Sequence, residues 1–146
     1  MARSSALYDD DFYAWSEEQA ALLRAGKVAE ADLAHIAEEI ESMGRTEKRE
    51  LVSRLTVLLT HLLKWQFQPE LRGRSWRLSI EVQRLDIEDH LKDNPSLKHL
   101  LDEAVGSAYL RARILAGKES GLDPVAFPTS CPFGFERMMD AQFWPD

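Results

Sequence analysis

The feature that most constrains this chain is an apolar pattern with helical spacing in residues 49–67, RELVSRLTVLLTHLLKWQF. Apolar side chains recur there every three or four residues, a spacing that places them on one face of an α-helix and excludes the alternation of a half-buried strand. That face comprises Leu51, Leu55, Leu58, Leu62 and Trp65, widened by Val52, Leu59 and Leu63. The segment therefore predicts the most buried helix of an all-α protein.

The rest of the chain repeats this spacing between residues that begin or end helices. Helix one begins at Asp9 or Asp10 and ends at Gly26. Helix two, whose apolar face is Leu33, Ile36, Ala37, Ile40 and Met43, begins at Asp32 and ends at Gly44. Helix three begins at Thr46. Helix four follows the breaks at Pro69 and Gly73 and runs from about Trp76 to Asp93, and helix five begins at Asn94 and Pro95 and ends at Gly117. We therefore expect a bundle of about five main helices.

The C-terminal segment differs in composition from the rest. Four of the six prolines lie after residue 120, with aromatic residues between them. We expect residues 118–146 to form an arm, with a short helix from about Pro132 to Asp140, on a single helical domain over residues 1–146. The arm either packs on the bundle or docks onto a second subunit, and in the first case it buries Phe127, Phe133, Phe135 and Phe143.

Charge and cysteine content exclude several classes of function. Eighteen basic and 25 acidic residues give a net charge of −7, which argues against binding to nucleic acids or anionic membranes. The densest positive cluster, Arg72, Arg74 and Arg77, is interpreted as solvated. One cysteine, Cys131, allows neither an internal disulfide nor a multi-cysteine zinc site, and its aromatic surroundings favour burial over reactivity. Without a signal peptide or an apolar span, the chain is expected to be cytoplasmic.

Several motifs occur in an order that resembles a known family. They are DDDFYAWSEEQAALLRAG, LAHIAEEIESMG, RELVSRL, HLLKWQFQP, SWRLSI with a following QR, and AFPTSCP. Together these motifs are similar to the bacterial family catalogued as domain of unknown function number 29, over nearly the whole chain. The resemblance implies a small all-helical bacterial protein without an established biochemical activity.

One candidate site is a metal site on helix two. His35, Glu38 and Glu39 lie within one helical turn of each other, where a divalent ion could be held. The alternative follows from a tight turn at Gly44 and Arg45. That turn would place the acidic side chains of helix two against basic side chains of helix three in a salt-bridged pair: Glu38, Glu39 and Glu41 against Lys48, Arg49 and Arg54. We favour this alternative and predict no bound cofactor.

A second candidate site lies between helices three and four. If they pair antiparallel, His61 is level with Gln83 and Arg84, and Trp65 approaches Trp76. Gln83 interrupts an apolar stripe, so its buried amide needs a partner, for which His61 is suitable. The cluster is either a structural network or a small-molecule pocket. In the network, Arg84 binds a carboxylate of helix two, such as Glu39 or Glu41. In the pocket, the catalytic candidates are His61 as the general base, Arg84 as the anion-binding group and Glu39. The candidate ligand contacts are Trp65, Trp76, Gln83 and Lys64. Lys64 is expected to reach solvent along its own stem.

Three functions follow from these residues. The first is a protein-interaction or self-association module that uses the aromatic arm or a groove between helices, and it is the one we favour. The second is an enzyme or small-ligand binder that uses His61 and Arg84. The third is a metal-binding bundle that uses His35, Glu38 and Glu39.

Overall fold

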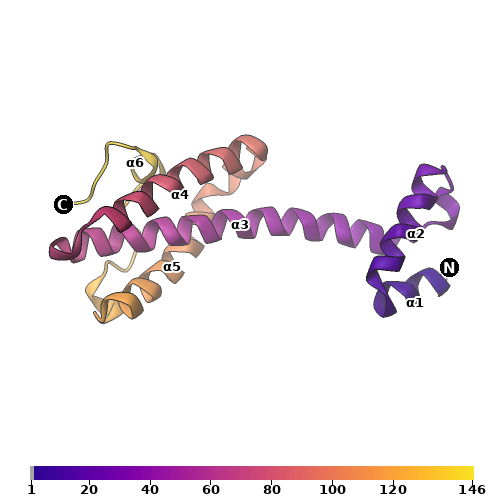
Figure 1. Cartoon of the computed structure of the whole chain (residues 1–146), viewed down its shortest axis with the longest axis horizontal. Helices are drawn as coiled ribbons and strands as arrows, with labels where there is room; N and C mark the ends of the chain where they lie inside the picture. Colours follow the sequence, from indigo (N-terminus) through magenta and orange to yellow (C-terminus); the bar gives the residue numbers. More distant parts are fainter. Residues whose placement is uncertain (1) are drawn as a thin grey trace. The chain divides into compact units, whose positions relative to one another are not determined.

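The computed structural model describes the backbone of residues 2–146 and the side chains of residues 6–146. These residues form six α-helices and no β-strand (Figure 1), so the predicted all-α class is confirmed. The helices are α1 (Ala2–Asp10), α2 (Phe12–Arg24), α3 (Leu33–Phe67), α4 (Arg74–Asp93), α5 (Leu101–Ser120) and α6 (Phe135–Met139). Short 3₁₀ turns are η1 (Val28–Glu30), η2 (Pro69–Leu71), η3 (Pro95–Leu100) and η4 (Pro124–Ala126). None of these helices combines the length and apolar character needed to cross a bilayer.

Two compact units make up the chain, residues 1–46 and residues 47–146, and α3 contributes to both. The prediction of one domain over residues 1–146 stays a prediction. The first unit contains α1, α2, η1 and the start of α3. Asp11 caps α2 by accepting a hydrogen bond of 3.0 Å from the amide of Ala14. The expected caps Asp9 and Asp10 instead lie in α1.

Helix α3 continues for 35 residues where two helices were predicted. Gly44 costs an α-helix only about 1 kcal/mol relative to alanine, and the backbone hydrogen bonds continue through it. Thr46 does not cap a new helix, because its hydroxyl donates to the carbonyl of Ser42, one turn earlier. The predicted turn and the helix pair built on it are therefore wrong.

The basic side chains expected to face the acidic side chains of helix two have other partners. Lys48 pairs with Glu103 at 2.7 Å, and Arg54 binds Glu50 and Asp86. The pairings differ from those predicted because no tight turn brings the two halves of α3 face to face.

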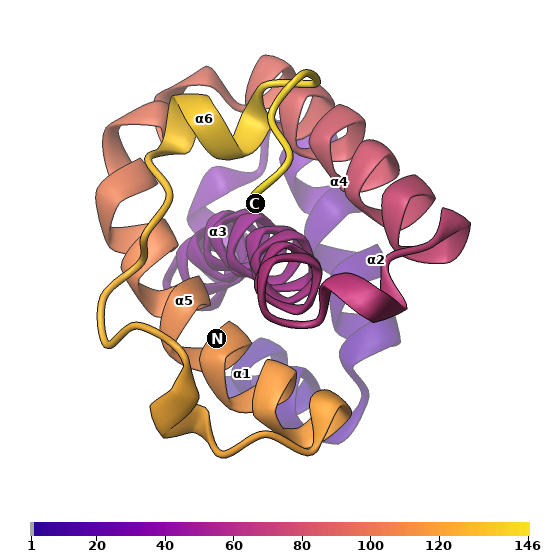
Figure 2. The ribbon, with the colours of Figure 1, turned by 90° about the vertical axis from the view of Figure 1, so that its left-hand side faces the viewer.

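The second unit is built around the C-terminal part of α3. Figure 2, which looks along α3, shows α4 and α5 on opposite sides of it. The leucines of the predicted buried face are fully buried, which confirms that prediction: Leu51, Leu55, Leu58 and Leu62. α5 contributes fully buried alanines at every fourth position, and such small side chains form a ridge that allows close helix packing: Ala104, Ala108, Ala112 and Ala116.

Helix α5 begins and ends later than predicted. Residues Pro95–Leu100 form the 3₁₀ turn η3, and the α-helix ends at Gly121, which has a left-handed φ of 79°. Gly117, the predicted stop, lies inside the helix. A Cβ atom there would be 3.0 Å from the carbonyl oxygen of Leu122 and 3.0 Å from Cγ of Pro124. This glycine therefore allows the following loop to pack against the helix.

The C-terminal arm packs on the second unit of its own chain. Phe127 and Phe133 are buried, whereas Phe135 and Phe143 are partly buried against the same core. The hydroxyl of Tyr109 on α5 donates a hydrogen bond of 2.5 Å to the carbonyl of Pro128. The predicted short terminal helix is present, but it is α6, from Phe135 to Met139, and is shorter than the predicted range from Pro132 to Asp140. Residues 132–134 before it are extended or bent.

Candidate functional site

The histidine of the predicted pocket is satisfied by its own helix. Nδ1 of His61 lies 2.8 Å from the carbonyl oxygen of Val57, one turn earlier on α3. Within the described residues, no hydrogen bond or ion pair joins His61 to Gln83 or Arg84. The buried Oε1 of Gln83 has no hydrogen-bond partner there. The predicted pairing of this amide with His61 is therefore not formed.

Arg84 binds the C-terminal arm. Its side chain is buried, Nε donates a hydrogen bond of 2.7 Å to the carbonyl of Met138, and one terminal nitrogen donates at 2.8 Å to the carbonyl of Phe143. The guanidinium also lies 5.2 Å from the ring of Trp144. Burial lowers the pKa of Arg84, whereas the negative charges of Asp140 and Glu81 act to raise it. Backbone carbonyls thus replace the carboxylate of Glu39 or Glu41 that was expected as its partner.

The two tryptophans of the predicted pocket have different partners. Trp65 packs against Trp144 with 4.8 Å between ring centroids and a tilt of 41°, and the guanidinium of Arg72 lies 5.5 Å from the centroid of the Trp65 ring. The ring of Trp76 instead faces Nζ of Lys64 at 4.9 Å. Each indole therefore faces a cation, and among the described residues Trp65 and Trp76 do not form an aromatic pair.

Lys64 does not reach solvent as predicted. Its side chain is buried, and Nζ lies 3.5 Å from the carboxylate of Glu119 on α5. The prediction was wrong because the ammonium group finds an acidic partner and an aromatic ring close to its own helix, so it does not need water to solvate its charge.

A polar and aromatic cluster holds the first unit together. Oδ2 of Asp32 accepts hydrogen bonds from Nε1 of Trp15 at 3.1 Å and from Nδ1 of His35 at 2.7 Å. The amide of Asp32 donates at 2.7 Å to the side chain of Gln19. Burial alone would raise the pKa of Asp32, but the hydrogen bonds from His35 and Trp15 outweigh it and hold this pKa below its usual value.

The predicted metal ligands belong to this cluster. Nδ1 of His35 is occupied by Asp32, and Glu39 accepts a hydrogen bond from the hydroxyl of Tyr8, whose ring lies 4.0 Å from the imidazole. That hydrogen bond raises the pKa of Tyr8 to about 12. Glu38 is exposed. Two of the three predicted ligands therefore have protein partners, and among the described residues these three do not form a cluster of metal-ligand geometry.

A different set of residues does have that geometry. Glu47 and Glu50 on α3 and His90 on α4 each offer one ligand atom, and these atoms lie within 4.8 Å of one another. No sequence pattern predicted this cluster. The Glu-x-x-Glu spacing places both carboxylates on one face of a helix, but no local pattern connects them to a histidine 40 residues later.

Cys131 is half-buried, and its thiol donates a hydrogen bond to the carbonyl of Phe133. Burial raises the pKa of this thiol. A thiol with a raised pKa carries little thiolate at neutral pH, so this position does not favour a nucleophile.

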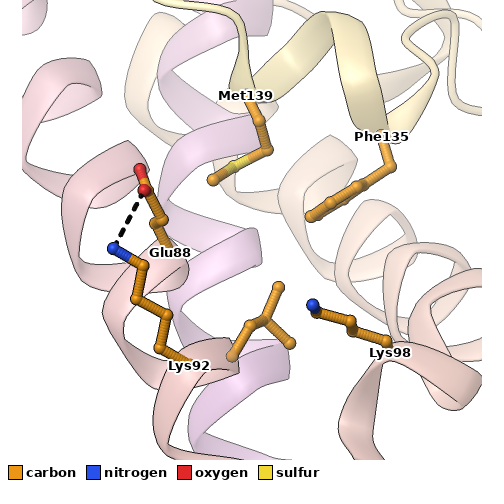
Figure 3. A pocket seen from close by; sticks show the side chains of 6 residues that line it. Glu88, Lys92, Lys98, Phe135 and Met139 are labelled. Carbon is orange, nitrogen blue, oxygen red and sulfur yellow. Dashed lines mark ion pairs between the residues drawn. The ribbon is translucent and has the colours of Figure 1, made fainter. Parts of the chain in front are cut away.

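A pocket of about 380 Å³ lies beside the end of α4 (Figure 3). Its apolar wall is formed by Leu91, Phe135 and Met139, whereas its polar side chains are Glu88, Lys92 and Lys98. Glu88 and Lys92 form an ion pair of 3.4 Å. None of the predicted ligand contacts lines this pocket.

Exposed apolar side chains are concentrated on helix faces. The N-terminal part of α3 carries an apolar seam, defined here as Leu33, Ile36, Ile40 and Met43. Leu33 is 51%, Ile40 62% and Met43 67% exposed, and Ile36 is partly exposed. These residues belong to the apolar face predicted for helix two. Further exposed apolar residues are Leu78, Val82 and Leu85 on α4 and Leu110 and Ile114 on α5.

Comparison with known proteins identifies a family. The family model described as "Domain of unknown function DUF29" matches residues 7–144. No curated protein and no solved structure shows significant similarity to the chain. Because the match covers nearly the whole sequence, the chain belongs to the DUF29 family, as its motifs suggested.

Proposed function

We propose that this DUF29 protein is a self-association module and that a second copy of the chain binds to the apolar seam of α3. One observation carries the proposal. Leu33, Ile40 and Met43 are half exposed or more, whereas the apolar face of the same helix between residues 51 and 62 is fully buried. A helix face of this kind is stabilised when another apolar surface removes it from water.

The spacing of the seam suits another helix. Its four residues are separated by three, four and three positions, the repeat that places apolar side chains along the contact line of a coiled coil. A second copy carries the same repeat and therefore presents matching knobs and holes. Pairing of one surface with itself closes a two-fold dimer.

Small residues beside the seam would let a partner helix approach closely. Ala37 and Gly44 follow Ile36 and Met43 by one position. A Cβ atom added to Gly44 would meet nothing within 4 Å, so the surface there is open. Glycine inside a helix costs roughly 0.5–1 kcal/mol, and close packing against a second helix accounts for its use here.

The charges along α3 favour an antiparallel pair. Residues 38–41 contain three glutamates, Glu38, Glu39 and Glu41. In an antiparallel pair centred on the seam, Glu41 of one copy lies level with His35 of the other and Glu39 lies level with Ala37. A parallel pair would instead place each glutamate level with the same glutamate of the other copy. Packed helices are about 8–10 Å apart, which is about one Debye length at physiological salt. The charges are therefore only partly screened, and they contribute to the choice of orientation.

Sedimentation of the purified chain over a range of concentrations tests the proposal. We expect a monomer–dimer equilibrium at concentrations up to about 100 µM, because a contact made by four apolar side chains of each copy is smaller than a standard stable interface, which has about 20–30 residues a side. Ile40→Glu should sediment as a monomer with unchanged far-ultraviolet circular dichroism. Leu110→Glu, a matched change at an exposed leucine of α5, should dimerise like the wild type. A monomeric wild type, or a dimer lost only in Leu110→Glu, would contradict the proposal.

A further inference from the structure

We propose that Glu47, Glu50 and His90 bind a divalent transition-metal ion within the second unit. This inference is independent of the apolar seam. Glu47 and Glu50 are three residues apart on α3, and His90 lies in the last turn of α4. One ligand atom from each of the three lies within 4.8 Å of the others. The bound ion would therefore join α3 to α4.

The hydrogen bonding of His90 prepares its ring for a metal ion. The side chain is only 8% exposed, and Nε2 lies 2.8 Å from the carbonyl oxygen of Glu47. Because a carbonyl only accepts hydrogen bonds, Nε2 carries the hydrogen and donates it. A neutral ring then keeps its lone pair on Nδ1. Metal-binding histidines characteristically donate their other N–H to a carbonyl or carboxylate in this way.

The lone pair of Nδ1 faces an acceptor. Oε2 of Glu50 lies 3.8 Å from Nδ1, a distance too long for a hydrogen bond. Two acceptors that face one another in a partly buried site repel unless a positive charge lies between them. Metal bonds of about 2.0–2.2 Å to nitrogen and to oxygen together span up to about 4.2 Å. An ion thus fits between these two atoms. Oε2 of Glu47 lies 3.6 Å from Nε2, the other ring nitrogen, so the side chain of Glu47 turns toward Nδ1 when it completes the ligand set.

Neighbouring side chains orient the carboxylates. Arg54 binds Oε1 of Glu50 with two hydrogen bonds of 3.1 and 2.8 Å, which leaves Oε2 directed at His90. The charge of Arg54 is itself balanced by Asp86 at 3.0 Å. The two ligand carboxylates therefore carry the −2 charge that a divalent cation neutralises.

The donor set indicates the class of ion. One imidazole nitrogen and two carboxylate oxygens suit Zn²⁺, Mn²⁺ or Fe²⁺, whereas Mg²⁺ and Ca²⁺ prefer oxygen ligands alone. The histidine thus gives the site its selectivity for transition metals.

Calorimetric titration of the full chain with Zn²⁺, after removal of metal with a chelator, tests the proposal. We expect one equivalent to bind to the wild type. His90→Gln should weaken binding by more than about 100-fold, since loss of a supporting residue alone costs 10–100-fold. The glutamine amide can still donate to the carbonyl of Glu47, so the fold is retained while the Nδ1 ligand is lost. His99→Gln, at an exposed histidine of η3, should bind like the wild type.

Thermal unfolding gives a second readout. Zn²⁺ should raise the Tm of the wild type and of His99→Gln, and leave that of His90→Gln unchanged. Glu50→Gln should reproduce the loss of binding and serves as the test should His90→Gln fail to fold. The proposal is overturned if the wild type takes up no stoichiometric Zn²⁺, or if the ligand variants bind it as tightly as the wild type does.

Discussion

Nε of Arg84, on α4, donates a hydrogen bond of 2.7 Å to the carbonyl oxygen of Met138, on α6. The same guanidinium donates to the carbonyl of Phe143, so one buried cation binds both α6 and the segment that follows it. Arginine suits this position because its planar, charged fork offers several donors in fixed directions. The contact makes the C-terminal arm an integral part of the second unit.

Arg84→Met should therefore destabilise the protein and release the arm. Loss of two hydrogen bonds from a charged donor, each worth about 1.5–3 kcal/mol, should lower the free energy of unfolding by about 3–6 kcal/mol. Urea denaturation measures this change, and hydrogen exchange should show faster exchange over residues 138–144. Arg77→Met, at an exposed position of the same helix, should change the stability little. Equal stability of the two variants would show that Arg84 does not hold the arm.

Two glycines of α5 should respond to alanine in opposite directions. Gly117→Ala places a methyl group 3.0 Å from the loop that follows the helix, and this overpacking should cost about 1–3 kcal/mol. Gly106→Ala meets nothing within 4 Å and is exposed, so higher helix propensity should stabilise the protein by roughly 0.5–1 kcal/mol. Thermal unfolding of both variants checks the pair. A gain in stability from Gly117→Ala would mean that the loop does not pack against this helix.

The Asp32 cluster should make the stability of the first unit depend on pH. The pKa of Asp32 lies below its ordinary value of 3.8 in the folded chain, so the unfolded chain binds the proton more readily. The ionised carboxylate therefore stabilises the fold at pH values above the unfolded pKa of 3.8. This contribution is lost as the pH falls through the lower pKa of the folded chain.

Unfolding free energies of the wild type and of Asp32→Asn, measured from neutral pH into acid, check this expectation. The wild type should be more stable at neutral pH, and the difference should shrink below pH 3.8. Asp10→Asn, at an exposed aspartate, serves as the control. A difference that stays constant into acid would show that the charge of Asp32 does not act through Trp15 and His35.

Local sequence signals predicted those parts of the fold that depend on neighbouring residues. The apolar spacing of residues 51–62 identified the buried helix face, because burial of one face requires that period whatever the packing partner is. Gly26 was correctly expected to end α2, since its φ of 75° is one that glycine adopts without strain. The all-α class followed from the same signals.

The candidate pocket could not be predicted in the same way. It required His61 to lie beside Gln83 and Arg84, and Trp65 to approach Trp76, whereas His61, Arg84 and Trp65 have other partners. Arg84 binds carbonyls of the arm, more than 50 residues later, and Lys64 binds Glu119. A periodicity shows which face of a helix is apolar and carries no information on which distant residue lies opposite.

The sequence by itself determined the helical class, the buried face of α3 and some helix ends, such as that of α2 at Gly26, because these follow from hydrogen bonding and burial within a few turns. Only the tertiary structure decided that α3 continues through Gly44, that its first apolar face is exposed, and that Glu47 and Glu50 meet His90. The physical reason is a difference in free energy. One glycine inside a helix costs only about 1 kcal/mol, and the packing contacts that decide which helices continue and which side chains meet contribute more than this.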